Sequence, residues 1–222
     1  MSEQLRLYSY WRSSAAYRVR IGLNLKGLAY ETVPVHLVRD GGEQHHAAYR
    51  HANPQGLVPA LCHGDAVLRQ SMAILEYLDE VWPQPALLPS GAVARQAVRS
   101  IAQLIACDIH PLNNLRVLQY FDKQWHVPQP ERDDWVHHWV KDGFTALEAL
   151  LSAPSSTAGE FCVGDTPTLA DCCLVPQMYN ARRFSVDLQN FPTLQRIEKT
   201  CLALPAFDAA RPEKQPDAPP PQ

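Results

Sequence analysis

The segment from Tyr10 to Leu23 reads YWRSSAAYRVRIGL and places two serines directly ahead of a run with helical spacing. The first N–H groups of a helix lack partners within the helix and carry partial positive charge, so hydroxyl donors beside them favour anion binding. Ser13 and Ser14 are such donors. The segment holds no cysteine, histidine or carboxylate that could act as nucleophile or base, so the reactive group stays unassigned here. The simpler interpretation is that one serine only caps the helix.

Two further stretches fit the binding of a small anionic peptide. We expect a cis peptide bond at Val58–Pro59, at the entrance of a strand, which would leave the backbone of Val58 free to pair with an extended chain. Gln70 and Ser71 open a second helical run, SMAILEYLDEV, and provide another anion site beside an amide. These parts together would bind a small peptide that carries a carboxylate.

The stretch CDIHPLNNLR also contains residues that could contact a ligand. Pro111 removes a backbone donor and is expected to kink a helix. His110 and Asn114 are four residues apart, so they share a helical face near that kink. They form either a core polar network or a ligand contact, and a hydrogen-bonding role fits His110 better than that of a general base.

The elements that position these residues differ between the two halves of the chain. Residues 5–10 alternate as in a strand, a helix follows Ser13, and residues 30–37 read as a second strand, which makes a right-handed βαβ unit. A hairpin with its turn at residues 63–65 and a helix from Ser71 complete the order βαβ-ββα. This order predicts a thioredoxin-like domain, an α/β fold.

Strand patterns nearly vanish in the second half, where apolar residues keep helical spacing. Thr168 and Asp171 have the spacing of a capping box that begins a buried helix. The predicted organisation is therefore α/β plus all-α, with a ligand-binding domain at 1–83, a linker at 84–90, an all-helical domain at 91–212 and a disordered, proline-rich tail at 213–222.

Composition excludes several classes of protein. The 222 residues are 46% apolar with a formal charge of −3, and no basic run exceeds two residues, so nucleic acid and anionic membranes are poor partners. No apolar run reaches the roughly 18 residues of a membrane span, and a basic, then apolar leader is missing from the first residues, so we expect a cytoplasmic protein. The six scattered cysteines are interpreted as buried thiols, and neither they nor the histidine pairs have zinc-site spacing.

The same motifs identify a family. The chain resembles the zeta-class glutathione transferases, the group that includes maleylacetoacetate isomerase and maleylpyruvate isomerase, in order from about residue 5 to residue 217. The stretches that carry the resemblance are SYWRSSAAYRVRIGLNLKG, VRDGGEQ, NPQGLVPAL, QSMAILEYL, CDIHPLNNLRVL, GDTPTLADCCLVPQ and NARRFSVDL.

The resemblance implies the glutathione transferase fold, a homodimer, and glutathione as cofactor. It assigns to glutathione the positions Ser13, Ser14, Gln44, Val58, Gln70, Ser71, His110 and Asn114. Arg12 and Arg183 would supply positive charge for a small dicarboxylic keto acid substrate, Arg116 is expected to face the same cleft, and Arg18 is expected to be structural. Ser13 is the first candidate for activating the thiol, and Ser14 is the second.

One departure from the family pattern stands at Ala15, where a cysteine is usual. Activities that need a protein thiol are therefore in doubt, whereas isomerisation is not, because the reacting thiol belongs to glutathione. The leading expectation is cis–trans isomerisation of maleylacetoacetate, with maleylpyruvate as the rival substrate. The alternatives are conjugation of glutathione to haloacids or aryl halides, and a non-catalytic interaction module that does not bind glutathione.

Overall fold

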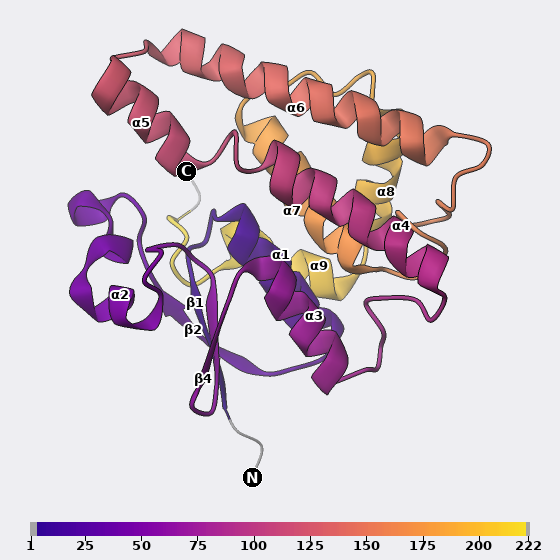
Figure 1. Ribbon diagram of the computed structural model, residues 1–222, viewed down its shortest axis with the longest axis horizontal. Helices are drawn as coiled ribbons and strands as arrows, with labels where there is room; N and C mark the ends of the chain where they lie inside the picture. Colours follow the sequence, from indigo (N-terminus) through magenta and orange to yellow (C-terminus); the bar gives the residue numbers. More distant parts are fainter. Residues whose placement is uncertain (1–3, 221–222) are drawn as a thin grey trace. The chain divides into compact units, whose positions relative to one another are not determined.

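The strands of the N-terminal half form one mixed sheet, as the alternating pattern predicts. In the computed structural model, which describes residues 4–220, β1 (Leu5–Ser9) pairs in parallel with β2 (Tyr30–Pro34) and antiparallel with β3 (Ala60–His63). β4 (Ala66–Arg69) completes a sheet of order β2-β1-β3-β4 (Figure 1). Alternate residues of β1 are buried, so one face of this strand packs into the core.

Two helices that pack against each other belong to this unit. α1 (Ser14–Leu25) and α3 (Ser71–Val81) are in contact, and a Cβ atom added at Gly22 would come within 2.2 Å of Leu75. Glycine at this position therefore permits the close approach of the two helices. Short helical segments between β2 and β3 comprise η1 (Arg39–Gly41), η2 (Glu43–His45) and α2 (Ala47–Ala52). The predicted order βαβ-ββα and the thioredoxin-like fold are confirmed.

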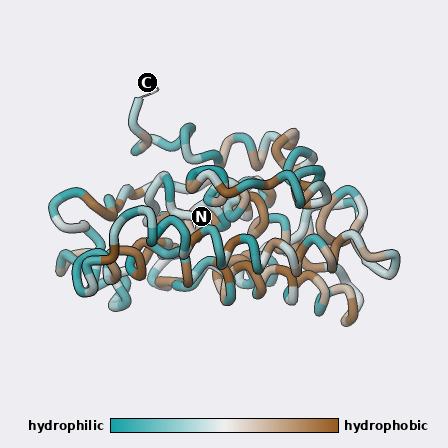
Figure 2. The backbone as a smooth tube through the Cα atoms, turned by 90° about the horizontal axis from the view of Figure 1, so that it is seen from above, coloured by the Kyte–Doolittle hydropathy of each residue, from teal (hydrophilic) through white to brown (hydrophobic). Residues whose placement is uncertain are grey.

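The C-terminal segment differs from the expected division of the chain. The chain forms two units, one comprising residues up to Leu87 together with those from Leu204 onward, and the other Leu88–Ala203. α9 (Pro205–Ala209) packs on α1, and η4 (Pro212–Lys214) follows it (Figure 1). Most of this segment is pale or teal in Figure 2, as its polar and proline-rich sequence requires. Instead of a disordered tail, the described part, up to residue 220, makes defined hydrogen bonds, while residues 221–222 lie outside the described residues.

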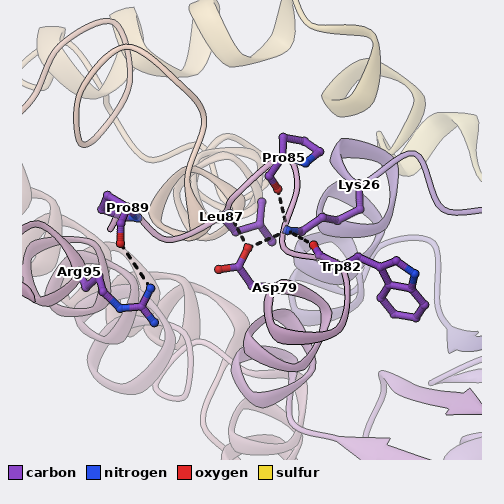
Figure 3. A network of polar contacts seen from close by, with 7 residues as sticks. All are labelled: Lys26, Asp79, Trp82, Pro85, Leu87, Pro89 and Arg95. Carbon is purple, nitrogen blue, oxygen red and sulfur yellow. Dashed lines mark hydrogen bonds and ion pairs between the residues drawn. The ribbon is translucent and has the colours of Figure 1, made fainter. Parts of the chain in front are cut away.

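A buried lysine anchors the segment that follows α3. Lys26 Nζ donates to Asp79 Oδ1 at 2.7 Å and to the carbonyl oxygens of Trp82 and Pro85, each at 2.6 Å (Figure 3). The same Asp79 oxygen accepts from Leu87 N–H at 2.6 Å. The lysine side chain is completely inaccessible to solvent, so its charge is stabilised by these three oxygens of the described residues.

We expect Lys26→Met to lower the free energy of unfolding by about 2–3 kcal/mol, because methionine retains the apolar stem but leaves a carboxylate and two carbonyls without their donor. Urea unfolding followed by circular dichroism measures this change. Lys123→Met, at an exposed position of α5 (Leu115–Trp125), is the control and should stay within about 0.5 kcal/mol of the natural protein. Equal shifts in both variants would contradict a stabilising role for the buried amine.

The second unit is helical, as predicted. It consists of α4 (Ala92–Gln103), the π-helical turn η3 (Leu104–Ile109), α5 (Leu115–Trp125), α6 (Gln129–Ser152), α7 (Leu169–Arg183) and α8 (Pro192–Leu202). The helix of α4 and η3 ends at Ile109 instead of kinking at Pro111. Its last bond runs from His110 N–H five residues back to Ile105 O at 2.9 Å, and a turn follows because Pro111 has no N–H with which to continue the helix. Within residues 4–220, no helix is both long and apolar enough to cross a membrane.

The predicted capping box begins α7. Asp171, which is fully buried, accepts from Thr168 N–H and from Thr168 Oγ1, each at 2.8 Å, through Oδ2. Its other oxygen accepts from Cys162 N–H at 2.8 Å. The carboxylate thus ties the loop before α7 to the first turn of the helix.

Candidate active site

Strand register brings four segments to the same end of the sheet. Tyr8 in β1 is opposite Ala60 in β3, and Ala60 is opposite Arg69 in β4. Since β3 is antiparallel to both neighbours, its first residue lies beside the last residues of β1 and β4. The parallel partner β2 ends at Pro34, opposite Ser9. The segments after β1, β2 and β4 and the one before β3 therefore share one edge, and they carry six of the predicted site residues: Ser13, Ser14, Gln44, Val58, Gln70 and Ser71.

The two serines occupy the first positions of α1. Ser13 is the N-cap, and its Oγ accepts from Ala16 N–H at 3.2 Å. This bond uses a lone pair and leaves the hydroxyl proton available for donation. Ser14 is mostly buried, and its hydroxyl has no hydrogen-bond partner among the described residues. Both hydroxyls thus lie at the positive end of α1, with Ser13 fixed in orientation by its cap.

The backbone of Val58 is unpaired. Val58–Pro59 is cis, as predicted. The preceding carbonyl, that of Leu57, accepts from Tyr49 Oη at 2.5 Å and from Asn53 Nδ2 at 2.7 Å. In contrast, the N–H and C=O of Val58 make no hydrogen bond within the part of the chain that the structure describes. An extended peptide could therefore pair with Val58 without displacing an existing bond.

The start of α3 forms the second predicted anion site. Gln70 has φ +68°, an uncommon conformation for a non-glycine residue, and turns the chain directly from β4 into α3. Its side-chain amide donates to Gln55 Oε1 at 2.9 Å. Ser71 Oγ accepts from Arg18 Nη1 at 3.3 Å, and the arginine is 2% exposed. Arg18, in the second turn of α1, therefore links this helix to the first residue of α3 and brings a buried positive charge to the anion site.

Gln44 lies in η2, on the loop after β2. Its Nε2 donates to Leu37 O at 3.2 Å, while Oε1 is buried without a partner among the described residues. A buried oxygen without a donor is costly. This oxygen is an acceptor suited to an N–H group of a bound peptide.

Two of the predicted arginines stack on aromatic rings next to them in sequence. The Arg12 guanidinium lies 5.2 Å from the ring centroid of Trp11 in the first unit, and that of Arg183 lies 4.6 Å from the centroid of Phe184 in the second. Arg12 forms no ion pair within residues 4–220. Its charge is therefore available to an anionic ligand.

The predicted pair in the helical unit is brought together. Asn114 Nδ2 lies 3.2 Å from His110 Nε2, and Asn114 also caps α5, its Oδ1 accepting from Arg116 N–H at 3.1 Å. The side chain of Arg116 is exposed. These three residues form one polar group at the start of α5.

Comparisons with known proteins identify relatives of the chain. Residues 3–80 match the family described as "Glutathione S-transferase, N-terminal domain". The chain is 54% identical over 212 residues to the probable maleylacetoacetate isomerase of Vibrio cholerae, covering 96% of this chain and 97% of the relative. It also matches the holo structure of a bacterial zeta-class glutathione S-transferase, maleyl pyruvate isomerase, at 47% identity and a TM-score of 0.93, covering 96% and 100% of the two chains.

A third relative is the maleylacetoacetate isomerase of Methylobacterium extorquens AM1, solved with bound malonate and GSH. It is 42% identical with a TM-score of 0.93, and the match covers 97% of this chain and 100% of the relative. Identity at this level over almost the whole length shows common ancestry as well as a common fold. The chain therefore belongs to the zeta class of the glutathione transferases.

Proposed function

We propose that the protein is a glutathione-dependent cis–trans isomerase of maleyl keto acids, with maleylacetoacetate as the leading substrate. The observation that carries the proposal is the shared edge of the sheet, where the unpaired backbone of Val58 and the first turns of α1 and α3 are held. Relatives named maleylacetoacetate isomerase and maleylpyruvate isomerase support this reaction.

The residues at this edge fit glutathione, an anionic tripeptide. The free N–H and C=O of Val58 would pair with its backbone, and the start of α3, with Ser71 and the Arg18 charge, would hold a carboxylate. The unpartnered Oε1 of Gln44 would accept an N–H group. The Val58 backbone and Gln44 Oε1 have no competing partner among the described residues, and Arg18 carries the positive charge that a carboxylate requires.

Glutathione, when bound, supplies a thiolate whose reversible addition turns the cis double bond into a single bond that can rotate. The role of Ser13 is to donate its hydroxyl proton to the thiolate sulfur, next to the partial positive charge of α1. A free thiol has a pKa of about 8.5, and lowering it by about two units requires roughly 2.7 kcal/mol. A charge-assisted hydrogen bond and a helix N-terminus together supply an effect of this size.

Positive charge is also needed for the substrate. We assign Arg12 and Arg183 to the substrate carboxylates and to the carbonyl oxygen on which negative charge develops, with Arg116 as a further contact. His110 and Asn114 would contribute hydrogen bonds to glutathione from the helical unit. Ala15 follows Ser14 in the chain as an inert side chain, which is consistent with a reaction that uses no protein thiol.

We further infer a cytoplasmic homodimer. The six cysteines form no disulfide bond in the described part of the chain, as expected in a reducing compartment. All except Cys107 are buried, so the expectation of buried thiols is wrong for that residue. The inference of a dimer depends on the resemblance to the zeta class, and sedimentation equilibrium of the purified protein tests it.

Turnover of maleylacetoacetate and of maleylpyruvate, each with a catalytic amount of glutathione, tests the proposed function. We expect isomerisation of maleylacetoacetate with the full amount of glutathione recovered, because the thiolate leaves at the end of each cycle. Much faster turnover of maleylpyruvate would assign the second substrate, which the 47% identical maleyl pyruvate isomerase makes a specific alternative. Stoichiometric loss of glutathione with haloacids or aryl halides, without isomerisation, would instead identify a conjugating transferase.

A further inference from the structure

The C-terminal segment contacts the turn that carries the serines. Asp217 Oδ2 accepts from the backbone N–H of Trp11 at 2.8 Å, across a sequence separation of 206 residues. Trp11 is two residues before Ser13, and the turn between them is closed by a bond from Ser13 N–H to Tyr10 O at 2.9 Å. The carboxylate therefore binds the turn on the side that precedes the N-cap of α1.

A buried arginine joins the same turn to the C-terminal segment. Arg20 Nη2 donates to Trp11 O at 3.0 Å, and Nη1 donates to Tyr10 O at 3.4 Å. Its Nε donates to Ala210 O at 3.0 Å. Burial lowers the pKa of Arg20 to about 10, so this side chain is still protonated at neutral pH. The backbone of Trp11 is thus held at its N–H by Asp217 and at its C=O by Arg20.

The C-terminal segment is ordered by its own polar contacts, so it can act as a fixed support. Gln215 Nε2 donates to Arg211 O at 2.8 Å and to Ala209 O at 3.1 Å. Ala206 O also accepts from Asn24 Nδ2 of α1 at 3.0 Å. These bonds place Asp217 relative to α1, the helix that Ser13 caps.

We propose that Asp217 is a positioning residue for thiol activation, because its carboxylate fixes the peptide group of Trp11 and thereby the direction in which Ser13 presents its hydroxyl. This role rests on the proposed function, in which Ser13 stabilises the thiolate of glutathione. The segment from Leu204 onward then serves the reaction without touching the substrate.

The charge of the Asp217 carboxylate and its hydrogen bond to Trp11 N–H have opposite effects on the pKa of the bound thiol. A carboxylate near the site repels a thiolate, so removal of its charge alone would lower the pKa of the bound thiol. Release of the Trp11 peptide would instead misplace the Ser13 hydroxyl and raise that pKa. The direction of the change therefore separates positioning from simple electrostatics, and a purely structural role would move only the unfolding temperature.

The experiment measures the pKa of enzyme-bound glutathione from the ultraviolet absorbance of its thiolate as a function of pH, together with kcat and KM for isomerisation. We expect Asp217→Ala to raise this pKa by about one unit and to lower kcat about tenfold. Asp217→Asn should keep kcat close to the natural value and should not raise the thiol pKa, because its amide oxygen can still accept from Trp11 N–H and only the charge is removed. Asp208→Asn is the matched control, since Asp208 pairs with Arg211 and Lys214 in the same segment without touching the turn.

An unchanged or lowered thiol pKa in Asp217→Ala would overturn the inference, and so would an Asp208→Asn variant that behaves like Asp217→Ala. Asp217→Ser, whose side chain is shorter, gives a second reading of the same contact if the alanine variant folds poorly. A natural protein that leaves the glutathione thiol at its free pKa would overturn the proposed function itself, which is a distinct result.

Discussion

Ser13→Ala is expected to lower kcat/KM for isomerisation at neutral pH roughly 100-fold, because a hydrogen bond to a charged group contributes about 1.5–3 kcal/mol. The rate falls because the substitution raises the pKa of the bound thiol, so that less thiolate is present at neutral pH. The deficit should therefore shrink as the pH is raised, since the thiolate then forms without the serine. Steady-state kinetics across pH, with the thiolate absorbance measured in parallel, check both parts.

The same substitution removes the N-cap of α1, which contributes about 1 kcal/mol to stability, so the two effects need separating. Ser13→Gly does this, because glycine is nearly as good an N-cap as serine yet has no hydroxyl. We expect it to be as inactive as the alanine variant and almost as stable as the natural protein. Ser14→Ala is the matched control at the next position, and a larger effect there would assign thiol activation to Ser14.

Asp171→Ala is expected to cost about 3–5 kcal/mol of unfolding free energy, because it orphans the N–H groups of Cys162 and Thr168 in a fully buried site. Asp171→Asn should be almost as damaging. The two backbone groups that face the carboxylate, Cys162 N–H at Oδ1 and Thr168 N–H at Oδ2, are both donors, so an amide in either orientation would direct its own N–H groups at a donor. Urea unfolding of both variants measures the cost, and Asp142→Asn, at an exposed position of α6, is the control.

The same carboxylate predicts a pH dependence. Burial raises the pKa of Asp171, so the folded protein takes up this proton at a higher pH than the unfolded chain does. Its ionisation therefore costs stability at neutral pH, and that cost disappears as the pH falls through the folded-state pKa. The unfolding free energy of the natural protein minus that of Asp171→Asn should increase toward acid pH. A flat difference would show that the pKa is not raised.

The elements of the first unit could be predicted because local chemistry agrees with the tertiary structure. The helix predicted from Ser71 spans Ser71–Val81 as expected, since its apolar stripe is the face that packs on α1. The common location of the candidate residues after β1 and β4 could also be predicted, because a βαβ-ββα order brings the ends of these strands to one edge. Gln44 came from the family resemblance alone. The ends of the strands could be predicted less exactly. The second strand was expected over residues 30–37, but β2 ends at Pro34, because a proline has no backbone N–H to donate to the neighbouring strand.

The contacts made by long side chains could not be predicted. Arg18 was expected to be structural, and only the approach of α1 to α3 shows that it reaches Ser71. The proline-rich, polar composition of the tail predicts disorder, because such a segment can bury little apolar surface. Composition cannot predict that the carboxylate of Asp217 accepts a hydrogen bond from a backbone N–H 206 residues away. Composition describes the average property of a segment, whereas this contact depends on a single residue, Asp217.

The discontinuity of the first unit has a consequence for synthesis on the ribosome. The sheet and its two packed helices emerge first, but the partners of Arg20 and Trp11 are separated from them by 190 and 206 residues and emerge after the entire helical unit. Contacts of this separation form late, because the intervening chain has to be ordered or looped out. The turn that presents Ser13 therefore acquires its hydrogen bond from Asp217 only when residue 217 has left the exit tunnel. This part of the site is translated early but completed last.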